Sequence, residues 1–300
     1  MSERSSDYKN VALVGTGYWG SKLKRYIEES QHFNLKCVCN SKSDLNEVWE
    51  DTDVEAVVIA TPNNTHYKLT KQALLSEKHV MVEKPLALTA KECIHLQSLA
   101  SEKRRTLLTE YTYTFSRALK KAVDIVKSGK LGNLVAVDMS VKHLGRFGGG
   151  RVYWLLGSHM LSVLDMFYPI KELDFKRKDI FVNEGEIESG IILFNGVIRG
   201  QISLSLNYPW KEPYVVFYCK NGTVKYVPEE KISLISVKYD RLVWTVADKL
   251  PKKIETYEID EKNNLRFAVN EFYDCIKGYK EDNITRAVEI TRILEELGSI

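Results

Sequence analysis

The feature that most constrains the fold is a glycine-rich turn, 15–20, which lies between an apolar run at 11–15 and a helical pattern at 18–30. In a G-x-G-x-x-G turn between strand and helix, the first glycine permits the tight turn and the second lets the backbone approach a pyrophosphate. The third glycine lets helix and strand pack closely, and the start of the helix offers N–H donors. The sequence therefore predicts a dinucleotide site formed by Gly15, Thr16, Gly17, Tyr18, Trp19 and Gly20.

Strand and helix patterns alternate through the first 120 residues. Further apolar strands are expected at 35–39, 55–62, 79–83 and 106–108, and helices at 65–76 and 89–103. Near-continuous apolar strands separated by helices imply a parallel sheet covered on both faces. We therefore predict an α/β fold whose N-terminal domain, 1–120, is a doubly wound Rossmann sheet that binds a dinucleotide.

The pattern changes after a helical stretch at 117–128. Alternating strands are expected within 134–141, 190–206 and 214–227, with hairpin signals at Asn195-Gly196 and Asn221-Gly222, and helices at 263–279 and 285–297. This predicts a second domain, 121–300, of the α+β type, built on an open and mostly antiparallel sheet that forms a meander. A broad sheet face with little helix to cover it usually marks an interface. We expect a homodimer or a dimer of dimers through this sheet.

The composition restricts the classes of function. The chain has 43 basic and 40 acidic residues, and this balance argues against a nucleic-acid partner. The first ten residues lack the apolar segment of a signal peptide, and no apolar run is long enough to span a bilayer. The five cysteines are scattered and form neither a disulfide framework nor a metal site. We expect a cytoplasmic protein without a metal or a membrane partner.

The residues after the second strand bear on the choice of cofactor. An NAD-preferring site usually offers an acid to the ribose hydroxyls about 20 residues after the glycine turn. The chain instead reads Asn40-Ser41-Lys42, in which nothing repels a 2′-phosphate and both Ser41 and Lys42 could bind one. This favours NADP. NAD stays open because Asn40 could bond ribose hydroxyls and because a lysine after a strand is often simply solvated.

The stretch 79–88 ends an apolar strand with a carboxylate, an ammonium and a proline. Pro85 cannot donate to a sheet ladder and disfavours a helical conformation at Lys84. Lys84 is therefore expected at the carboxyl end of a strand, where open α/β sheets bind ligands. An ammonium there can stabilise an oxygen on which negative charge develops. The alternative is a surface lysine at the end of a turn.

Together with ATPNNTHYKL and VEKPLALT, the glycine turn resembles the glucose–fructose oxidoreductase/inositol dehydrogenase (Gfo/Idh/MocA) family. The resemblance continues in SGKLGNLVAVD and in the C-terminal helices. It implies hydride transfer between NAD(P) and a hydroxyl or ketone of a sugar, cyclitol or nucleotide-linked sugar, in a protein that pairs through its open sheet. The cofactor-binding residues that it adds are Thr61, Pro62, Asn63, His66, Glu83, Lys84 and Pro85.

The resemblance implies two catalytic residues. Lys84 matches the catalytic lysine of the family's Glu-Lys-Pro motif, and His159 falls on the histidine of its helical Asp-x-x-x-His motif as general acid/base. Leu155 stands where the family has the aspartate, on the same helix face as His159 if the helix is regular. Either another group compensates, with Tyr111, Tyr113 and Tyr153 as candidates, or catalysis is weakened. The expected substrate-binding residues are Lys84, Tyr111, Tyr113, Arg146, Arg151, Tyr153 and His159.

Three alternatives stay open. The loop 146–151 could pair an anionic substrate group with arginine, or it could be a solvated connector. Because Leu155 replaces the aspartate, the chain could be a regulator that senses a dinucleotide or a sugar without turnover. It could also reduce a non-sugar double bond, as in tetrapyrrole or imine reductases related to this family.

Overall fold

A computed structural model describes residues 8–145, 147, 152–228, 234–238, 253–259 and 264–298. Packing divides the chain into two compact units, Met1–Thr112 with Asn263–Arg292 and Tyr113–Lys262 with Ile293–Ile300. The units therefore differ from the expected domains, 1–120 and 121–300, in two places. Residues 113–120 group with the second unit, and most of the two C-terminal helices groups with the first.

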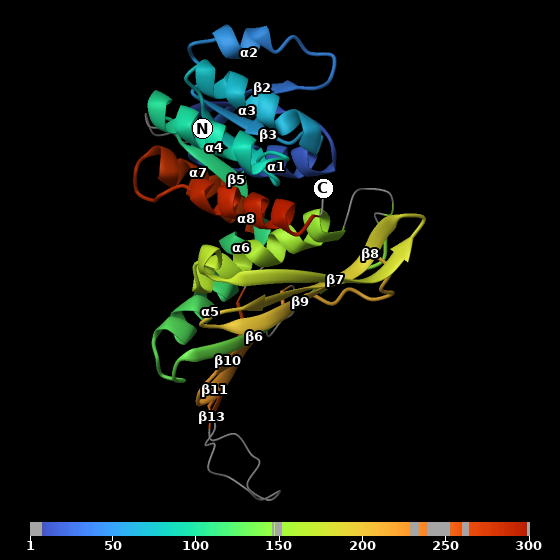
Figure 1. The fold of residues 1–300 in the computed structure, drawn as a ribbon. Coiled ribbons are helices and arrows are strands. Elements are labelled where there is room, and N and C mark those ends of the chain that lie inside the picture. The colour runs from blue at the N-terminus through green and yellow to red at the C-terminus, as the bar shows by residue number, and fades with distance from the viewer. Residues whose placement is uncertain are drawn as a thin grey trace, which may run out of the picture. The chain divides into compact units, whose positions relative to one another are not determined.

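The first unit is built on a five-stranded sheet in the order β2-β1-β3-β4-β5, and all neighbouring strands are parallel (Figure 1). Its strands are β1 (Lys9–Val14), β2 (Phe33–Cys39), β3 (Ala56–Ile59), β4 (His79–Glu83) and β5 (Leu107–Glu110). Its helices are α1 (Tyr18–Glu28), α2 (Asn46–Glu50), α3 (His66–Leu75), α4 (Ala90–Lys103), α7 (Asn264–Ile276) and most of α8 (Ile284–Glu296). This is the Rossmann sheet that the sequence predicts.

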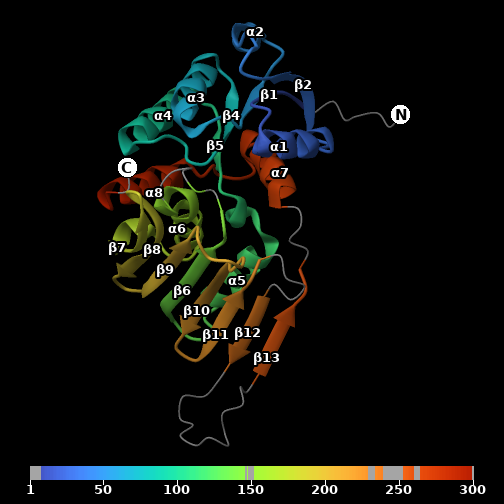
Figure 2. The same cartoon turned by 90° about the vertical axis from the view of Figure 1, so that its right-hand side faces the viewer.

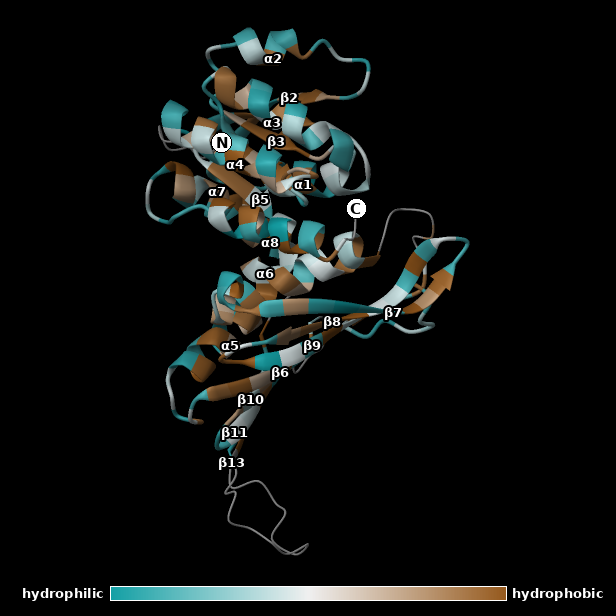
Figure 3. Cartoon of the chain, viewed as in Figure 1, coloured by the Kyte–Doolittle hydropathy of each residue, from teal (hydrophilic) through white to brown (hydrophobic). Residues whose placement is uncertain are grey.

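Helices cover both faces of this sheet. Helices α3 and α4 pack together on one face, and α1 and α7 pack together on the other (Figure 2). Residues Val11 to Leu13 of β1 and all of β3 are buried, as expected for strands between two helix layers. The hydropathy colouring shows the same division, with apolar segments in the strands and polar segments on α3 and α4 (Figure 3).

Aromatic packing explains why the C-terminal segment returns to the first unit. Phe272 of α7 is fully buried and stacks on Phe33 of β2, with ring centroids 5.6 Å apart. Tyr273 stacks on His32 at 4.3 Å. Large buried rings of this kind contribute strongly to a core. The amphipathic pattern of 263–279 predicts the helix but not the sheet on which it packs.

The second unit is built on an eight-stranded sheet in the order β13-β12-β11-β10-β6-β9-β8-β7. Its strands are β6 (Leu134–Lys142), β7 (Asp174–Asn183), β8 (Glu186–Asn195), β9 (Arg199–Ser205), β10 (Tyr214–Cys219), β11 (Gly222–Tyr226), β12 (Leu234–Lys238) and β13 (Lys253–Tyr257). Its helices are α5 (Arg117–Lys127) and α6 (Ser158–Phe167). The two Asn-Gly signals lie between β8 and β9 and between β10 and β11, where hairpins form, as predicted.

The strand order corrects the expected meander. The sheet is mostly antiparallel, but β6 lies between β10 and β9 and pairs with β9 in parallel. The long connection from β6 to β9, which contains α6 and the β7–β8 hairpin, makes this possible because parallel strands need a crossover. Local alternation predicts each strand, but it does not encode which strand lies beside which.

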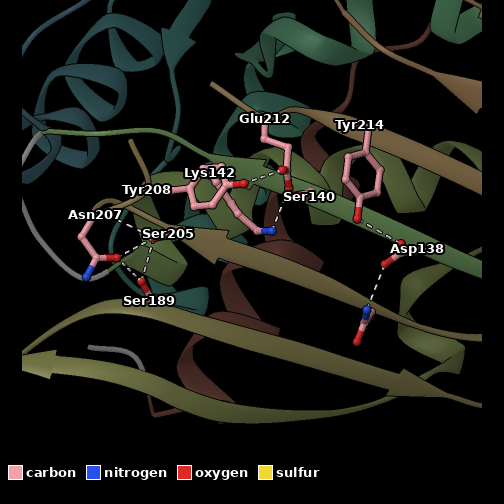
Figure 4. Close-up of polar contacts among 10 residues, drawn as sticks. Asp138, Ser140, Lys142, Ser189, Ser205, Asn207, Tyr208, Glu212 and Tyr214 are labelled. Carbon is pink, nitrogen blue, oxygen red and sulfur yellow. Dashed lines mark hydrogen bonds and ion pairs between the residues drawn. The ribbon is translucent and has the colours of Figure 1, made fainter. Parts of the chain in front are cut away.

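The two faces of the second sheet differ. Side chains such as Val137, Met139 and Phe217 are buried on the face that α5 and α6 cover. The other face, which we call the open face, carries a polar network in the described residues (Figure 4). In this network Lys142 Nζ donates to Glu212 Oε1 at 2.7 Å, and Tyr214 donates to Asp138 Oδ2 at 3.1 Å.

Candidate functional site

The glycine turn has no room for side chains at two of its positions. A Cβ on Gly15 would lie 2.2 Å from the Ala60 carbonyl oxygen, and the φ of Gly15 is +111°. A Cβ on Gly20 would lie 2.1 Å from the Gly15 carbonyl oxygen. Both glycines therefore permit a close approach of β1, α1 and the end of β3, as the sequence pattern indicates.

The second glycine of the turn faces open space. Gly17 is the N-cap residue of α1, and an added Cβ would meet no atom within 4 Å. No side chain caps this helix start, and its first turn contains no acidic residue. Thr16 and Tyr18 are exposed beside it, and Trp19 is half-buried. We call Gly15, Gly17 and the first turn of α1 the glycine-turn cradle. N–H donors at the positive end of a helix dipole attract phosphate, so this cradle fits the pyrophosphate of a dinucleotide.

The loop after β2 is held by its own side chains. Asn40 Oδ1 accepts a hydrogen bond from the Lys42 N–H at 2.8 Å, and Ser43 Oγ accepts one from the Asn40 N–H at 3.0 Å. Asn40, Ser41 and Lys42 are all exposed. The Asn40 oxygen is therefore engaged within the loop, whereas the Ser41 and Lys42 side chains face solvent.

The loop after β3 is fixed by a buried histidine. The His66 ring is 0% exposed, with Nδ1 2.6 Å from the Pro85 carbonyl oxygen and Nε2 2.9 Å from the Thr61 carbonyl oxygen. Burial lowers the pKa of His66 below its ordinary value, and the two carbonyl contacts oppose this effect. Pro62 and Asn63 are exposed. This geometry does not support direct cofactor contact by His66, which instead ties the loop at Thr61 to the residue after Lys84.

Lys84 follows β4 directly, and its side chain is half-buried. The peptide bond between Lys84 and Pro85 is cis. The preceding residue, Glu83, is in register with Glu110 on β5, and the two side chains are 8% and 1% exposed. The lysine therefore follows a buried pair of carboxyl groups at the carboxyl ends of β4 and β5.

Glu110 is a site residue that our sequence analysis missed. Burial and the Glu83 carboxylate raise the pKa of Glu110 well above its ordinary value, although the hydrogen bond from Thr112 and the charge of Lys84 oppose this. Thr112 Oγ1 donates to Glu110 Oε2 at 2.9 Å. The available signal was that two neighbouring apolar strands, β4 and β5, both end in glutamate.

In the second unit, His159 lies just after an irregular helix turn. Residues Tyr153–Gly157 form a π-helix, in which the Ser158 N–H donates to the Tyr153 carbonyl oxygen, and α6 begins at Ser158. Such insertions are frequent at functional sites. The half-buried His159 ring meets the Tyr113 ring edge to face, with centroids 5.4 Å apart. The wider turn corrects the regular helix that we expected around Leu155 and His159.

The other expected substrate-binding residues have different positions. Tyr153 is 0% exposed, and its hydroxyl donates to Asp179 Oδ1 at 2.8 Å, so it packs under β7 and is not available to a substrate. Tyr111 is 0% exposed after the end of β5. Arg146 and Arg151 lie outside the described residues. Within the described part of the chain, no group of three or more His, Cys, Asp or Glu could hold a metal ion.

The fold and the glycine-turn cradle together define a dinucleotide-binding protein of the Rossmann type. The family described as "Oxidoreductase family, NAD-binding Rossmann fold" (GFO_IDH_MocA) matches residues 23–111. Among curated relatives, 2,7-anhydro-N-acetylneuraminate hydratase of Escherichia coli is 26% identical over 72% of this chain and 67% of its own length. An uncharacterised oxidoreductase of Synechocystis is 32% identical over 49% of this chain and 41% of its own length. The alignments with two further curated relatives span 37% of the length of each relative.

Solved structures share the whole fold. An inositol dehydrogenase homologue from Azotobacter vinelandii, in complex with NADH and myo-inositol, has a TM-score of 0.81 at 18% identity and covers 99% of this chain and 96% of its own. A 3-ketoreductase from Actinomadura kijaniata, in complex with TDP-benzene and NADP, has a TM-score of 0.82 at 13% identity over 97% of both chains. The family match covers residues 23–111, so this part of the chain is similar to the NAD-binding Rossmann domain of the Gfo/Idh/MocA oxidoreductases. The solved structures extend the similarity of fold over the rest of the chain. In the described residues, no helix is long and apolar enough to cross a membrane.

Proposed function

We propose that this protein transfers a hydride between a nicotinamide cofactor and a hydroxyl or ketone of a sugar, cyclitol or nucleotide-linked sugar. The observation that carries the proposal is the position of Lys84, half-buried at the carboxyl end of β4 in the unit that also contains the glycine-turn cradle. Ligands of open α/β sheets bind at the carboxyl ends of the strands. Two of the proteins named above print a sugar acid or a cyclitol in their names, 2,7-anhydro-N-acetylneuraminate and myo-inositol, and this supports the substrate class.

The chain's own residues have distinct proposed roles. The glycine turn and the start of α1 bind the pyrophosphate, and Thr61, Pro62 and Asn63 line the cofactor. When bound, the nicotinamide supplies or accepts the hydride. Lys84 hydrogen-bonds the reacting oxygen and stabilises the negative charge that develops on it. His159 is proposed as the general acid/base, and Tyr113 restricts its ring through their edge-to-face contact.

The proposal is tested by following nicotinamide absorbance with a panel of keto-sugars, inositols and nucleotide-linked sugars. Consumption of reduced cofactor with at least one carbonyl compound supports it. If the chain bound cofactor but oxidised or reduced nothing in the panel, it would instead be a regulator. This is the alternative that Leu155, at the position of the family's aspartate, favours.

A second candidate function is redox-neutral hydration, because two curated relatives carry the name of a hydratase. The same panel separates this function from net oxidation or reduction. A hydratase would give a product that has gained one water with no net change in nicotinamide absorbance.

The cofactor preference gives a separate prediction. We expect NADP(H) to bind more tightly than NAD(H), because Asn40-Ser41-Lys42 presents exposed Ser41 and Lys42 side chains and no acid. Replacing Lys42 with alanine should weaken the binding of NADP(H) and leave the binding of NAD(H) unchanged, because only the 2′-phosphate would form an ion pair with this lysine. Calorimetric titration of both cofactors measures this. Tighter binding of NAD(H) to the unaltered protein would contradict the preference.

We further propose that two chains pair through the open face. Its strands expose a mixture of apolar and polar side chains, among them Leu193 (44% exposed) and Tyr218 (42% exposed). The network around Lys142 and Glu212 is prearranged on the same face (Figure 4). A sheet face of this size would bury a substantial area against a second copy.

We expect a homodimer or a dimer of dimers that Tyr218→Glu weakens, because the substitution places a charge within the paired face. Val197→Glu is the matched control, since Val197 is 76% exposed and lies in the turn between β8 and β9. Light scattering at micromolar protein measures the mass of all three proteins. A monomeric unaltered protein would rule out the pairing.

A further inference from the structure

The carboxyl ends of β4 and β5 bring two buried carboxyl groups together. Glu83 and Glu110 are paired in register on parallel strands, and such neighbours lie about 4.8 Å apart. Their side chains are 8% and 1% exposed, so neither group is well solvated. Carboxylates are almost never fully buried unless they are paired with a suitable partner.

The polar contacts of Glu110 do not compensate for a negative charge on this residue. In the described part of the chain, the polar contact of its carboxyl group is the 2.9 Å hydrogen bond from Thr112 to Oε2, and Oε1 has no hydrogen-bond partner. Two like charges in one buried site cannot both be stable, so one of the two groups keeps its proton. Glu110 is the more deeply buried of the two.

We propose that Glu83 and Glu110 hold one proton between them, mainly on Glu110. The pair then carries a single negative charge, on Glu83, the residue before Lys84. Glu110 is thus a positioning residue, which acts through Lys84 and does not touch the substrate.

Two charged groups act on Glu110. Glu83 and Lys84 act on Glu110 from β4, and burial outweighs both the Lys84 charge and the Thr112 hydrogen bond in raising the pKa of Glu110. Asp282 and Asn283, which precede α8, bond instead to the backbone of Leu107 and Thr109 in β5. Of the charged groups that act on Glu110, Glu83 therefore has the largest effect on its pKa.

The consequence for Lys84 rests on the proposed function. A second negative charge beside an ammonium would make it hold its proton more tightly. A neutral Glu110 avoids this, and Lys84 then makes a stronger hydrogen bond to the oxygen of a carbonyl substrate. As the hydride reaches the carbon, an N–H bond of the proposed general acid His159 breaks and an O–H bond forms on that oxygen, while Lys84 keeps its proton.

The protonation state can be measured without any turnover. Infrared spectroscopy should show a protonated carboxylic acid at neutral pH, and Glu110→Gln should remove its band. Glu102→Gln, at an exposed position on α4, should leave the band unchanged. Absence of the band in the unaltered protein would overturn the proposal, and this result does not depend on whether any variant folds.

The pH dependence of stability gives a second readout. A carboxyl group whose pKa is raised by folding makes the folded state bind more protons than the unfolded state. Stability is then lost as pH rises from the unfolded pKa of about 4.3 towards the folded value. Glu110→Gln should therefore raise the melting temperature at about pH 8 and leave it unchanged near pH 4. A difference that is independent of pH would contradict the shared proton.

The third readout is the pH profile of turnover on an identified carbonyl substrate. Glu110→Gln should remove the fall in turnover that accompanies ionisation of Glu110 at alkaline pH, whereas a merely structural change would scale the whole profile. If the turnover of Glu110→Gln still fell at alkaline pH as in the unaltered protein, the proposed effect of Glu110 on Lys84 would be contradicted. If the infrared and stability results hold but no substrate is turned over, the proposed function fails and the shared proton stands.

Discussion

Replacing Lys84 with methionine is expected to lower turnover by about 10²–10⁴-fold, the usual range for loss of one positioned acid/base or electrostatic donor. Methionine nearly preserves the volume of the lysine stem, so the packing beside Pro85 should be kept. The glycine-turn cradle lies on β1 and α1 and should be unaffected. Cofactor affinity should therefore change little, and the loss should appear in kcat.

Lys68→Met is the matched control, because Lys68 is an exposed lysine on α3. Its turnover should equal that of the unaltered protein. Steady-state kinetics on the identified substrate, with calorimetric titration of cofactor, measures both quantities. Near-normal turnover in Lys84→Met would mean that the lysine only ends a turn.

Replacing Gly17 with alanine is expected to weaken cofactor binding by at least about tenfold, or roughly 1.4 kcal/mol, without loss of stability. The φ of Gly17 is −69°, which alanine adopts without strain, and the added Cβ meets no atom within 4 Å. The methyl group would instead occupy the space in front of the α1 N–H donors, where a pyrophosphate would bind. Calorimetric titration and a thermal melt measure the two effects.

Gly20→Ala provides the contrast. Its Cβ would lie 2.1 Å from the Gly15 carbonyl oxygen, so the backbone has to move. Overpacking of this kind costs about 1–3 kcal/mol, and the melting temperature should fall even without cofactor. If Gly17→Ala bound cofactor normally, or destabilised the fold as much as Gly20→Ala, the cradle would be assigned to the wrong glycine.

Much of the first unit could be predicted from local sequence. Its strands are near-continuous apolar runs, and the glycine turn has a required position between strand and helix. The start of α4 also has a local signal, because Thr89 and Glu92 have the spacing of a capping box. In the structure, the Thr89 side chain accepts a hydrogen bond from the Glu92 N–H. The glycine-turn cradle and the position of Lys84 could be predicted from these local patterns, because each depends on residues that are close together in the chain.

Other features depend on contacts between distant residues. The return of α7 to β2 requires Phe272 to meet Phe33, and the β6–β9 pair joins strands separated by α6 and a hairpin. The Glu83–Glu110 pair needs the register of two strands, which no single segment encodes. Tyr153, the first residue of the π-helix before His159, donates its hydroxyl hydrogen bond to Asp179 of β7, 26 residues further along the chain. Local patterns could not reveal any of these features.

The central claim is that this chain moves a hydride and that Lys84 assists the oxygen that receives the proton. The most direct measurement is a single-turnover experiment with cofactor deuterated at the transferred position and the carbonyl panel, analysed by mass spectrometry. We predict deuterium at the new carbinol carbon of one product, formed by the unaltered protein and by Lys68→Met, and formed about 10²–10⁴-fold more slowly by Lys84→Met. Cofactor binding without deuterium transfer to any compound, or equal rates in Lys84→Met and the unaltered protein, would contradict the claim.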